Sequence, residues 1–173
     1  MAMNKNKKTK LIIVLATLFV VAGFVFMFGN GLKTRKSDST IMPEATGTTE
    51  PLNDGVIITQ NFVNTTDTIS SLGIVFYRIT YYEDVHLIIE LLDGDNILAS
   101  KRIDVSKVED YHRTFVEPSK KLTGMKDKTL TIRIYCEEVA DTGLVVMMSD
   151  KVNSNYQYNG KSEKGSLCFS VNE

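Results

Sequence analysis

The sequence predicts an all-β domain, an antiparallel two-layer sandwich of about eight strands, preceded by a single N-terminal transmembrane helix. A long uncharged run near the start of the chain predicts the helix. Beyond residue 55, short runs rich in Ile, Val, Thr, Tyr and Phe are separated by Asp, Asn and Gly clusters about every ten residues, which predicts strands and turns. The length of 173 residues leaves room for one domain of ordinary size.

Residues 11–29 carry no charged side chain and follow a basic head, residues 1–10. At about 1.5 Å per residue the run makes a helix of roughly 28 Å, close to the hydrocarbon thickness of a bilayer. A cleaved secretory signal is the alternative, because a basic head and the small residues Val20-Val21-Ala22 also suit a signal peptidase. The apolar run continues to Phe28, past the usual ~7–15 residues of a signal peptide, and this favours an anchor.

The orientation follows from the larger part of the chain. Basic residues flank the run on both sides, and a C-terminal domain of this length is translocated largely regardless of charge. We therefore expect a single-pass protein of the cell membrane, with a cytoplasmic N-terminus and an extracytoplasmic domain over residues 55–173. Residues 30–54 are rich in Ser, Thr and Gly, contain Pro43 and Pro51, and predict a flexible stalk.

The strands of the domain are predicted in order from their apolar patterns. Leu130, Ile132, Ile134 and Cys136 alternate with polar residues, so they share one face and form the clearest strand. Two such sheets packed together suggest a jelly roll rather than an immunoglobulin-like arrangement. The predicted strands are residues 55–62, 68–81, 85–92, 97–105, 112–117, 129–137, 144–148 and 167–171.

Asp93-Gly94-Asp95-Asn96 has the composition of a hairpin turn, since Gly and Asn accept positive φ at little cost. Its oxygen atoms also suit calcium. The segment lacks a twelve-residue loop ending in Glu, so a plain hairpin is favoured.

Four parts of the domain have a recognisable pattern: Ile69 to Phe76, Val85 to Asp93 with Ile97 to Ser100, Tyr158-Asn159-Gly160-Lys161, and Gly165 to Phe169. Together they resemble a known type of β-sandwich, the extracytoplasmic jelly-roll domains of Gram-positive bacterial membrane proteins of the polysaccharide-synthesis and glycosyltransferase kind. The chain has one apolar run and no catalytic region. The resemblance therefore implies a non-catalytic module near envelope glycopolymer or its assembly machinery.

The sequence shows no constellation of catalytic residues, and we expect no enzyme. It contains no Gly-x-Ser-x-Gly elbow, P-loop or dinucleotide-binding glycine motif. His86 and His112 have no Cys or Glu at metal-ligand spacing, so neither a metal nor a cofactor is expected. A formal net charge of −1 excludes a strongly basic nucleic-acid binder.

The two cysteines and one sequon are further candidates for chemistry. Cys136 falls on the apolar face of its strand, whereas the alternation around Cys168 puts that residue on the surface. Side chains on different faces do not bridge, so two free thiols are predicted.

Asn64-Thr65-Thr66 is a glycosylation sequon, which would matter only in a eukaryotic secretory route.

The candidate ligand-binding residues lie in the polar stretch 150–165, which is long for a connection and hence favours a functional loop. Sugar-binding sandwiches stack rings on exposed aromatics, and without Trp this task falls to Tyr. The alternative is a short edge hairpin turning at Asn159-Gly160. The predicted site residues are Asn155, Tyr156, Tyr158 and Asn159.

These observations together predict a membrane-anchored, non-catalytic module of the cell surface that binds envelope glycopolymer or supports its assembly. The alternative is a protein-binding accessory subunit of a larger membrane complex. The expected partners are thus the membrane, an envelope polysaccharide and a membrane protein of its assembly system.

Overall fold

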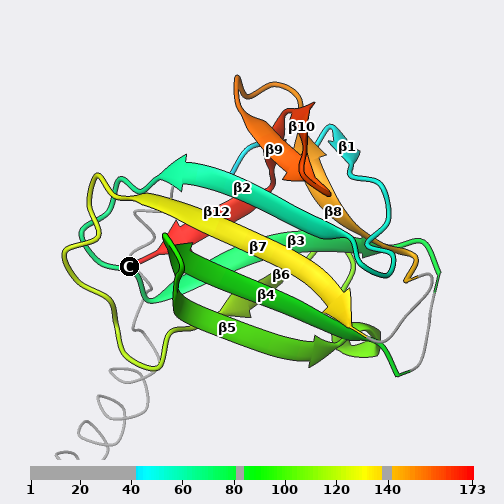
Figure 1. Ribbon diagram of the computed structural model, residues 1–173, viewed down its shortest axis with the longest axis horizontal. Helices are drawn as coiled ribbons and strands as arrows, with labels where there is room; N and C mark the ends of the chain where they lie inside the picture. Colours follow the sequence, from blue (N-terminus) through cyan, green and yellow to red (C-terminus); the bar gives the residue numbers. More distant parts are fainter. Residues whose placement is uncertain (1–41, 81–83, 138–141) are drawn as a thin grey trace, which may run out of the picture. The chain divides into compact units, whose positions relative to one another are not determined.

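The computed structural model describes residues 42–80, 84–137 and 142–173. Over these residues the fold is all-β, and two antiparallel sheets pack face to face as a sandwich (Figure 1). The predicted fold class is confirmed at this level. The predicted head, the membrane helix and the first part of the stalk lie outside the described residues. Within the described ranges, no helix is long and apolar enough to cross a membrane.

Each sheet contains six strands among the described residues. One sheet has the order β10-β9-β2-β7-β4-β5 and is called sheet B here. The other, sheet A, has the order β1-β8-β3-β12, with β11 paired to β8 and β6 paired to β3. Sheet B consists of β2 (Ile57–Val63), β4 (His86–Asp93), β5 (Asn96–Asp104), β7 (Thr129–Glu137), β9 (Asn155–Tyr158) and β10 (Lys161–Lys164). Sheet A consists of β1 (Gly47–Thr48), β3 (Ser71–Arg78), β6 (Arg113–Val116), β8 (Leu144–Ser149), β11 (Ser166–Leu167) and β12 (Phe169–Asn172).

Strand β7 illustrates how the sequence pattern builds the core. Its residues alternate between buried and half-exposed, and its bounds agree with the predicted strand. The side chains of Ile132 and Ile134 are fully buried, as predicted. They meet a core supplied by both sheets, which includes Leu72 and Phe76 of β3.

The turn between β4 and β5 is the predicted hairpin. Asp93 pairs with Asn96, and Gly94 between them has a φ of 58°, as a type II′ turn requires at its first central position. The Asp93 carboxylate accepts a hydrogen bond from Lys128 Nζ over 2.8 Å. The Asp93 carboxylate, one of the oxygen groups that suit calcium, is therefore already paired with Lys128.

The predicted stalk ends earlier than the sequence pattern indicates. Residues 46–52 run along β8: Thr46 N donates to Met148 O and Leu52 N to Leu144 O, each over 2.9 Å. Leu52 is fully buried in the core. The backbone hydrogen bonds and this single leucine hold the segment, although its composition is that of a linker.

Cys168 is buried, which corrects the surface position expected for it. The strand is interrupted at this residue, so the alternation read across 167–171 does not hold. Cys168 N donates to Met147 O over 2.8 Å, and its carbonyl accepts from Val75 N over 3.2 Å. The residue thus lies inside sheet A, between β8 and β3. Cys136 is also buried and both thiols are free, as predicted.

Candidate functional site

The stretch from residue 150 to 165 forms a hairpin of β9 and β10, which was the alternative to a binding loop. Asn159 and Gly160 have φ values of 50° and 78° at the turn. Positive φ at both central positions is the signature of a type I′ turn, which suits Asn-Gly. The sequence therefore forms a tight hairpin here because its two turn residues tolerate the left-handed region.

The four predicted site residues do not form one surface. Tyr156 is 7% exposed and belongs to the core, and Tyr158 is half-buried against it. The Tyr158 hydroxyl donates to Pro51 O over 2.6 Å. Asn155 and Asn159 are exposed. Because side chains alternate along β9, the two rings face inward and the amides face solvent. Burial, the largest cause, raises the pKa of both phenols.

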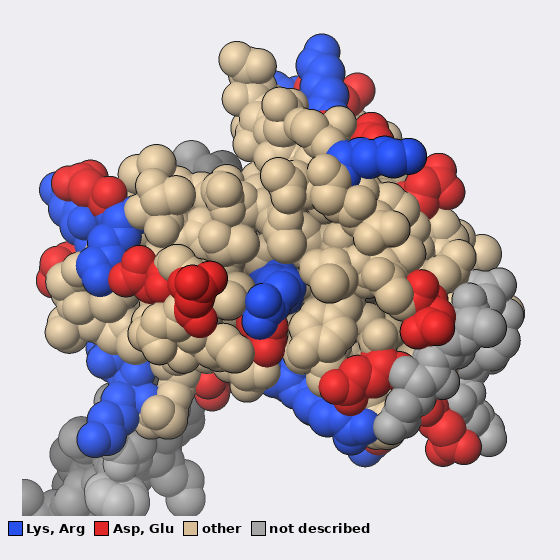
Figure 2. Space-filling view, viewed as in Figure 1, with Lys and Arg blue, Asp and Glu red and all other residues tan. Residues whose placement is uncertain are grey.

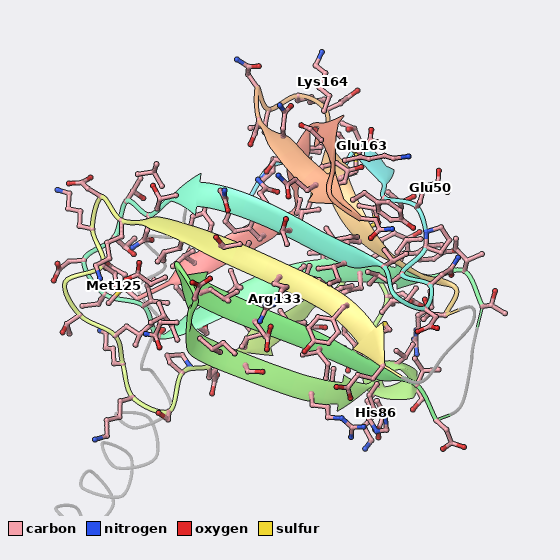
Figure 3. All side chains as sticks on the ribbon, viewed as in Figure 1. Glu50, His86, Met125, Arg133, Glu163 and Lys164 are labelled. Atoms are coloured by element: carbon pink, nitrogen blue, oxygen red, sulfur yellow. The ribbon has the colours of Figure 1, made fainter. Side chains whose placement is uncertain are left out.

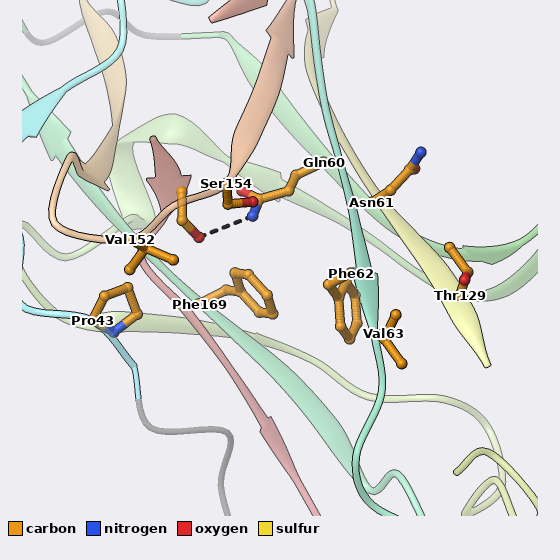
Figure 4. A pocket seen from close by; sticks show the side chains of 10 residues that line it. Pro43, Gln60, Asn61, Phe62, Val63, Thr129, Val152, Ser154 and Phe169 are labelled. Atoms are coloured by element: carbon orange, nitrogen blue, oxygen red, sulfur yellow. Dashed lines mark hydrogen bonds between the residues drawn. The ribbon is translucent and has the colours of Figure 1, made fainter. Parts of the chain in front are cut away.

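A pocket of about 410 Å³ lies beside the contact between Phe62 of β2 and Phe169 of β12 (Figure 4). This volume falls within the ~300–1,000 Å³ typical of small-molecule sites. It is lined by Pro43, Gln60, Asn61, Phe62, Val63, Thr129, Val152, Ser154, Ser166 and Phe169. The lining joins β2 and β7 of sheet B to β11 and β12 of sheet A, so the pocket exists only once the sheets have packed.

Two phenylalanines form the apolar part of the pocket. The ring centroids of Phe62 on β2 and Phe169 on β12 lie 4.8 Å apart, with an angle of 54° between the ring planes. Pro43 and Val152 lie on the other side of the space, near Phe169 (Figure 4). The arrangement offers aromatic faces and aliphatic edges to a ligand with an apolar side.

A hydrogen-bonded group forms the polar end of the pocket. Gln60 Nε2 donates to Ser166 Oγ over 2.9 Å, and Leu167 N donates to Gln60 Oε1 over 2.7 Å. Gln60 is 3% exposed. Among the described residues, the second hydrogen of Gln60 Nε2 has no acceptor. A buried amide with a spare donor is a group that a ligand hydroxyl can satisfy.

The backbone of β2 supplies further polar groups at the rim. Along a strand, the N–H and C=O of successive residues point to opposite sides. Ile57 O accepts from Asn159 N over 2.8 Å, so odd-numbered residues of β2 face β9. On β2, the residues that pair with β9 are Ile58 and Thr59. The N–H and C=O of Asn61 therefore face the free edge beyond β9, and no described residue pairs with them.

The pocket is uncharged: none of its lining residues is ionisable. The charged residues next to Pro43 and Val152 in the chain are paired with each other, since Lys151 Nζ contacts Glu44 Oε2 over 2.7 Å. This hydrogen bond lowers the pKa of Glu44 and raises that of Lys151. A neutral ligand with both apolar and hydrogen-bonding groups fits this environment best.

Sequence reasoning placed Phe62 and Phe169 in strands but did not bring them together as a site. One signal was present in the first strand, where Gln60 stands between Ile58 and Phe62 on the inward-facing positions. A polar residue in an apolar stripe needs a partner inside the fold. That partner, Ser166, lies on a strand of the other sheet, and only the folded structure identifies it.

The two histidines and the asparagine of the sequon make structural contacts. His86 Nε2 lies 3.0 Å from Asp104 Oδ1, and His112 Nδ1 lies 3.0 Å from Asp110 O. Asn64 is fully buried, and its Nδ2 donates to the carbonyls of Thr66 and Met125. Both amide hydrogens are thus engaged, so the sequon is closed to a glycosyltransferase in the folded domain.

No protein-family model matches this chain, and no curated protein is significantly similar to it in sequence.

Proposed function

We propose that the protein is a non-catalytic, membrane-anchored module of the cell surface that binds a neutral sugar unit of an envelope glycopolymer in the Phe62–Phe169 pocket. The observation that carries the proposal is an uncharged pocket that combines two aromatic rings with a buried amide donor. Sugar rings present C–H groups on one face and hydroxyls at the edge. The rings of Phe62 and Phe169 suit the first, and Gln60 suits the second.

The expected affinity is modest. A few aromatic contacts and hydrogen bonds give ~−4 to −6 kcal/mol, which corresponds to millimolar to high micromolar dissociation constants. Weak sites of this kind suit a module held near its ligand, because anchoring raises the effective concentration. The anchor in this proposal is the helix predicted over residues 11–29, with the sandwich outside the cell. The proposal includes that the sandwich is related to the extracytoplasmic jelly-roll domains that its sequence resembles.

A pocket-filling variant tests the binding site. Val152→Trp places a large side chain at the pocket wall and should abolish retention of the full chain on cell-wall polysaccharide. Ile79→Trp is the matched control, since Ile79 is exposed and does not line the pocket. Retention of both variants alike would refute the pocket as the sugar site.

Protease treatment tests the orientation. Protease added to intact cells or protoplasts should degrade the sandwich before the membrane is permeabilised. A sandwich that survives until permeabilisation would reverse the proposed topology.

A protein-binding accessory subunit is the second candidate, and the free edge of β2 favours it. Unpaired N–H and C=O groups at a sheet edge accept an added strand from a partner, with alternate side chains entering neighbouring pockets. In this case crosslinking in membranes would recover a protein partner through Asn61 or Val63, and no glycan would be retained.

A further inference from the structure

The outer face of sheet B adjoins the pocket, and Figure 2 shows a mostly uncharged surface with one basic group and neighbouring acidic atoms near its centre. Strand pairing places outward-facing residues in rows across β2, β7 and β4. One row contains Asn61, Thr131 and Leu92; the next contains Thr59, Arg133 and Glu90. Asn61 and Thr129 belong both to the pocket lining and to this face, so the two surfaces are continuous over the end of β2.

Arg133 lies at the middle of this face (Figure 3). Its Nε donates to Glu90 Oε2 over 2.6 Å. The Glu90 side chain is only 7% exposed, whereas that of Arg133 is 36% exposed. Among the described residues, the Nη groups of Arg133 have no acceptor. Glu90 therefore fixes the guanidinium through one nitrogen and leaves its outer edge available.

The chemistry of the Arg133–Glu90 pair indicates which ligands the outer edge of the guanidinium would bind. Arg133 and Glu90 together are neutral, so the site does not attract an anion as an isolated arginine would. Two amide groups offer neutral donors nearby, Gln157 in the same row as Arg133 and Asn61 in the next row. Asn61 Oδ1 accepts from Thr131 Oγ1, and Gln157 Oε1 accepts from Thr59 Oγ1. The NH₂ groups of these amides have no acceptor among the described residues, and all of these donors suit hydroxyl oxygens.

We propose that a neutral glycan chain with one unit in the Phe62–Phe169 pocket continues over Asn61 onto the outer face of sheet B, where Arg133 donates hydrogen bonds to the hydroxyls of a later unit. This inference rests on the proposed function. Thr129 and Arg133 are four residues apart on β7, about 14 Å at ~3.4 Å per residue. A single sugar ring does not span that distance, but a chain of several linked rings does.

The test uses Arg133→Lys, which keeps a cation beside Glu90 but removes the planar edge of donors. The full chain in detergent micelles is titrated with neutral glucan oligosaccharides of increasing length and with their monosaccharide. We expect the affinity for long oligosaccharides to fall about tenfold in this variant. The affinity for the monosaccharide should not change. Arg102→Lys is the matched control, because Arg102 is also paired with a glutamate on this sheet, at the edge strand β5.

Each outcome of the titration decides a different point. If wild-type binding does not grow stronger with chain length, the role of Arg133 is wrong. The same holds if Arg133→Lys leaves the affinity unaltered for every length. In both cases binding of one sugar unit in the pocket is unaffected. Binding restricted to acidic oligosaccharides and weakened by salt overturns the neutral ligand class. A wild-type chain that binds no oligosaccharide overturns both the inference and the proposed function. Equal melting temperatures of the variants and wild type show that the losses do not come from unfolding.

Discussion

The side-chain amide of Gln60 on β2 donates to the hydroxyl of Ser166 on β11, and this 2.9 Å hydrogen bond joins the two sheets at the polar end of the pocket. The same amide accepts from Leu167 N, so one side chain satisfies two polar groups of the opposite sheet. The bond therefore stabilises the sandwich and orients a donor toward the pocket.

Replacing Gln60 with leucine should lower the free energy of unfolding by about 1–3 kcal/mol, because it leaves Ser166 Oγ and Leu167 N buried without this partner. Urea denaturation measures the change. Gln157→Leu, at an exposed position of β9, should stay within about 0.5 kcal/mol of wild type. Equal stability of the Gln60 variant and wild type would show that the bond between the sheets contributes nothing.

Replacing Leu52 with alanine tests whether the segment before residue 55 belongs to the domain. The side chain is fully buried, so its truncation should cost about 2–5 kcal/mol in thermal or urea unfolding. Asp54→Ala, in an exposed turn, serves as the control. A flexible stalk would give no difference between the two variants.

Replacing Tyr156 with alanine should destabilise the domain by about 3–5 kcal/mol, since its ring is part of the core. Tyr158→Phe removes only the hydroxyl that donates to Pro51 O and should cost about 0.5–1.5 kcal/mol. If the Tyr156 variant instead lost polysaccharide retention at unchanged melting temperature, the hairpin and not the pocket would be the sugar site.

The two thiols should be inert in the native protein. Burial raises the pKa of Cys136 to about 12 and that of Cys168 to about 11, from an ordinary value of 9.0. Iodoacetamide at pH 8 should leave the folded chain unmodified and alkylate both residues in denaturant. Above about pH 9 the unfolded chain ionises its thiols while the folded chain keeps them protonated, so these groups favour unfolding as the pH rises. Rapid labelling of native protein would contradict their burial.

The sequence predicted those parts of the fold that depend on local pattern. The alternation of Leu130, Ile132 and Ile134 predicted a strand and its buried face, and Gly94 predicted a turn, because side-chain period and backbone freedom are local properties. Leu52 was missed because its neighbours have the composition of a linker, and only pairing with β8 makes the segment ordered.

The candidate site could be predicted from the sequence even less than the fold. Phe62 and Phe169 come together only because β2 and β12 belong to opposing sheets, and no spacing in the sequence expresses that proximity. The polar neighbours of Tyr156 predicted a ring available for stacking, yet the alternation of β9 turns this ring into the core. The orientation of the hairpin relative to the sheet was the missing information.

An NMR titration shows whether the pocket between Phe62 and Phe169 binds a neutral sugar. Neutral cell-wall oligosaccharides are added to the isotope-labelled full chain in detergent micelles, and amide shifts are followed. We predict that the largest changes occur at the side-chain NH₂ of Gln60 and the backbone N–H of Asn61, and that Val152→Trp abolishes them. Changes confined to the β9–β10 turn, or no changes with any oligosaccharide, would show that this pocket does not bind the sugar.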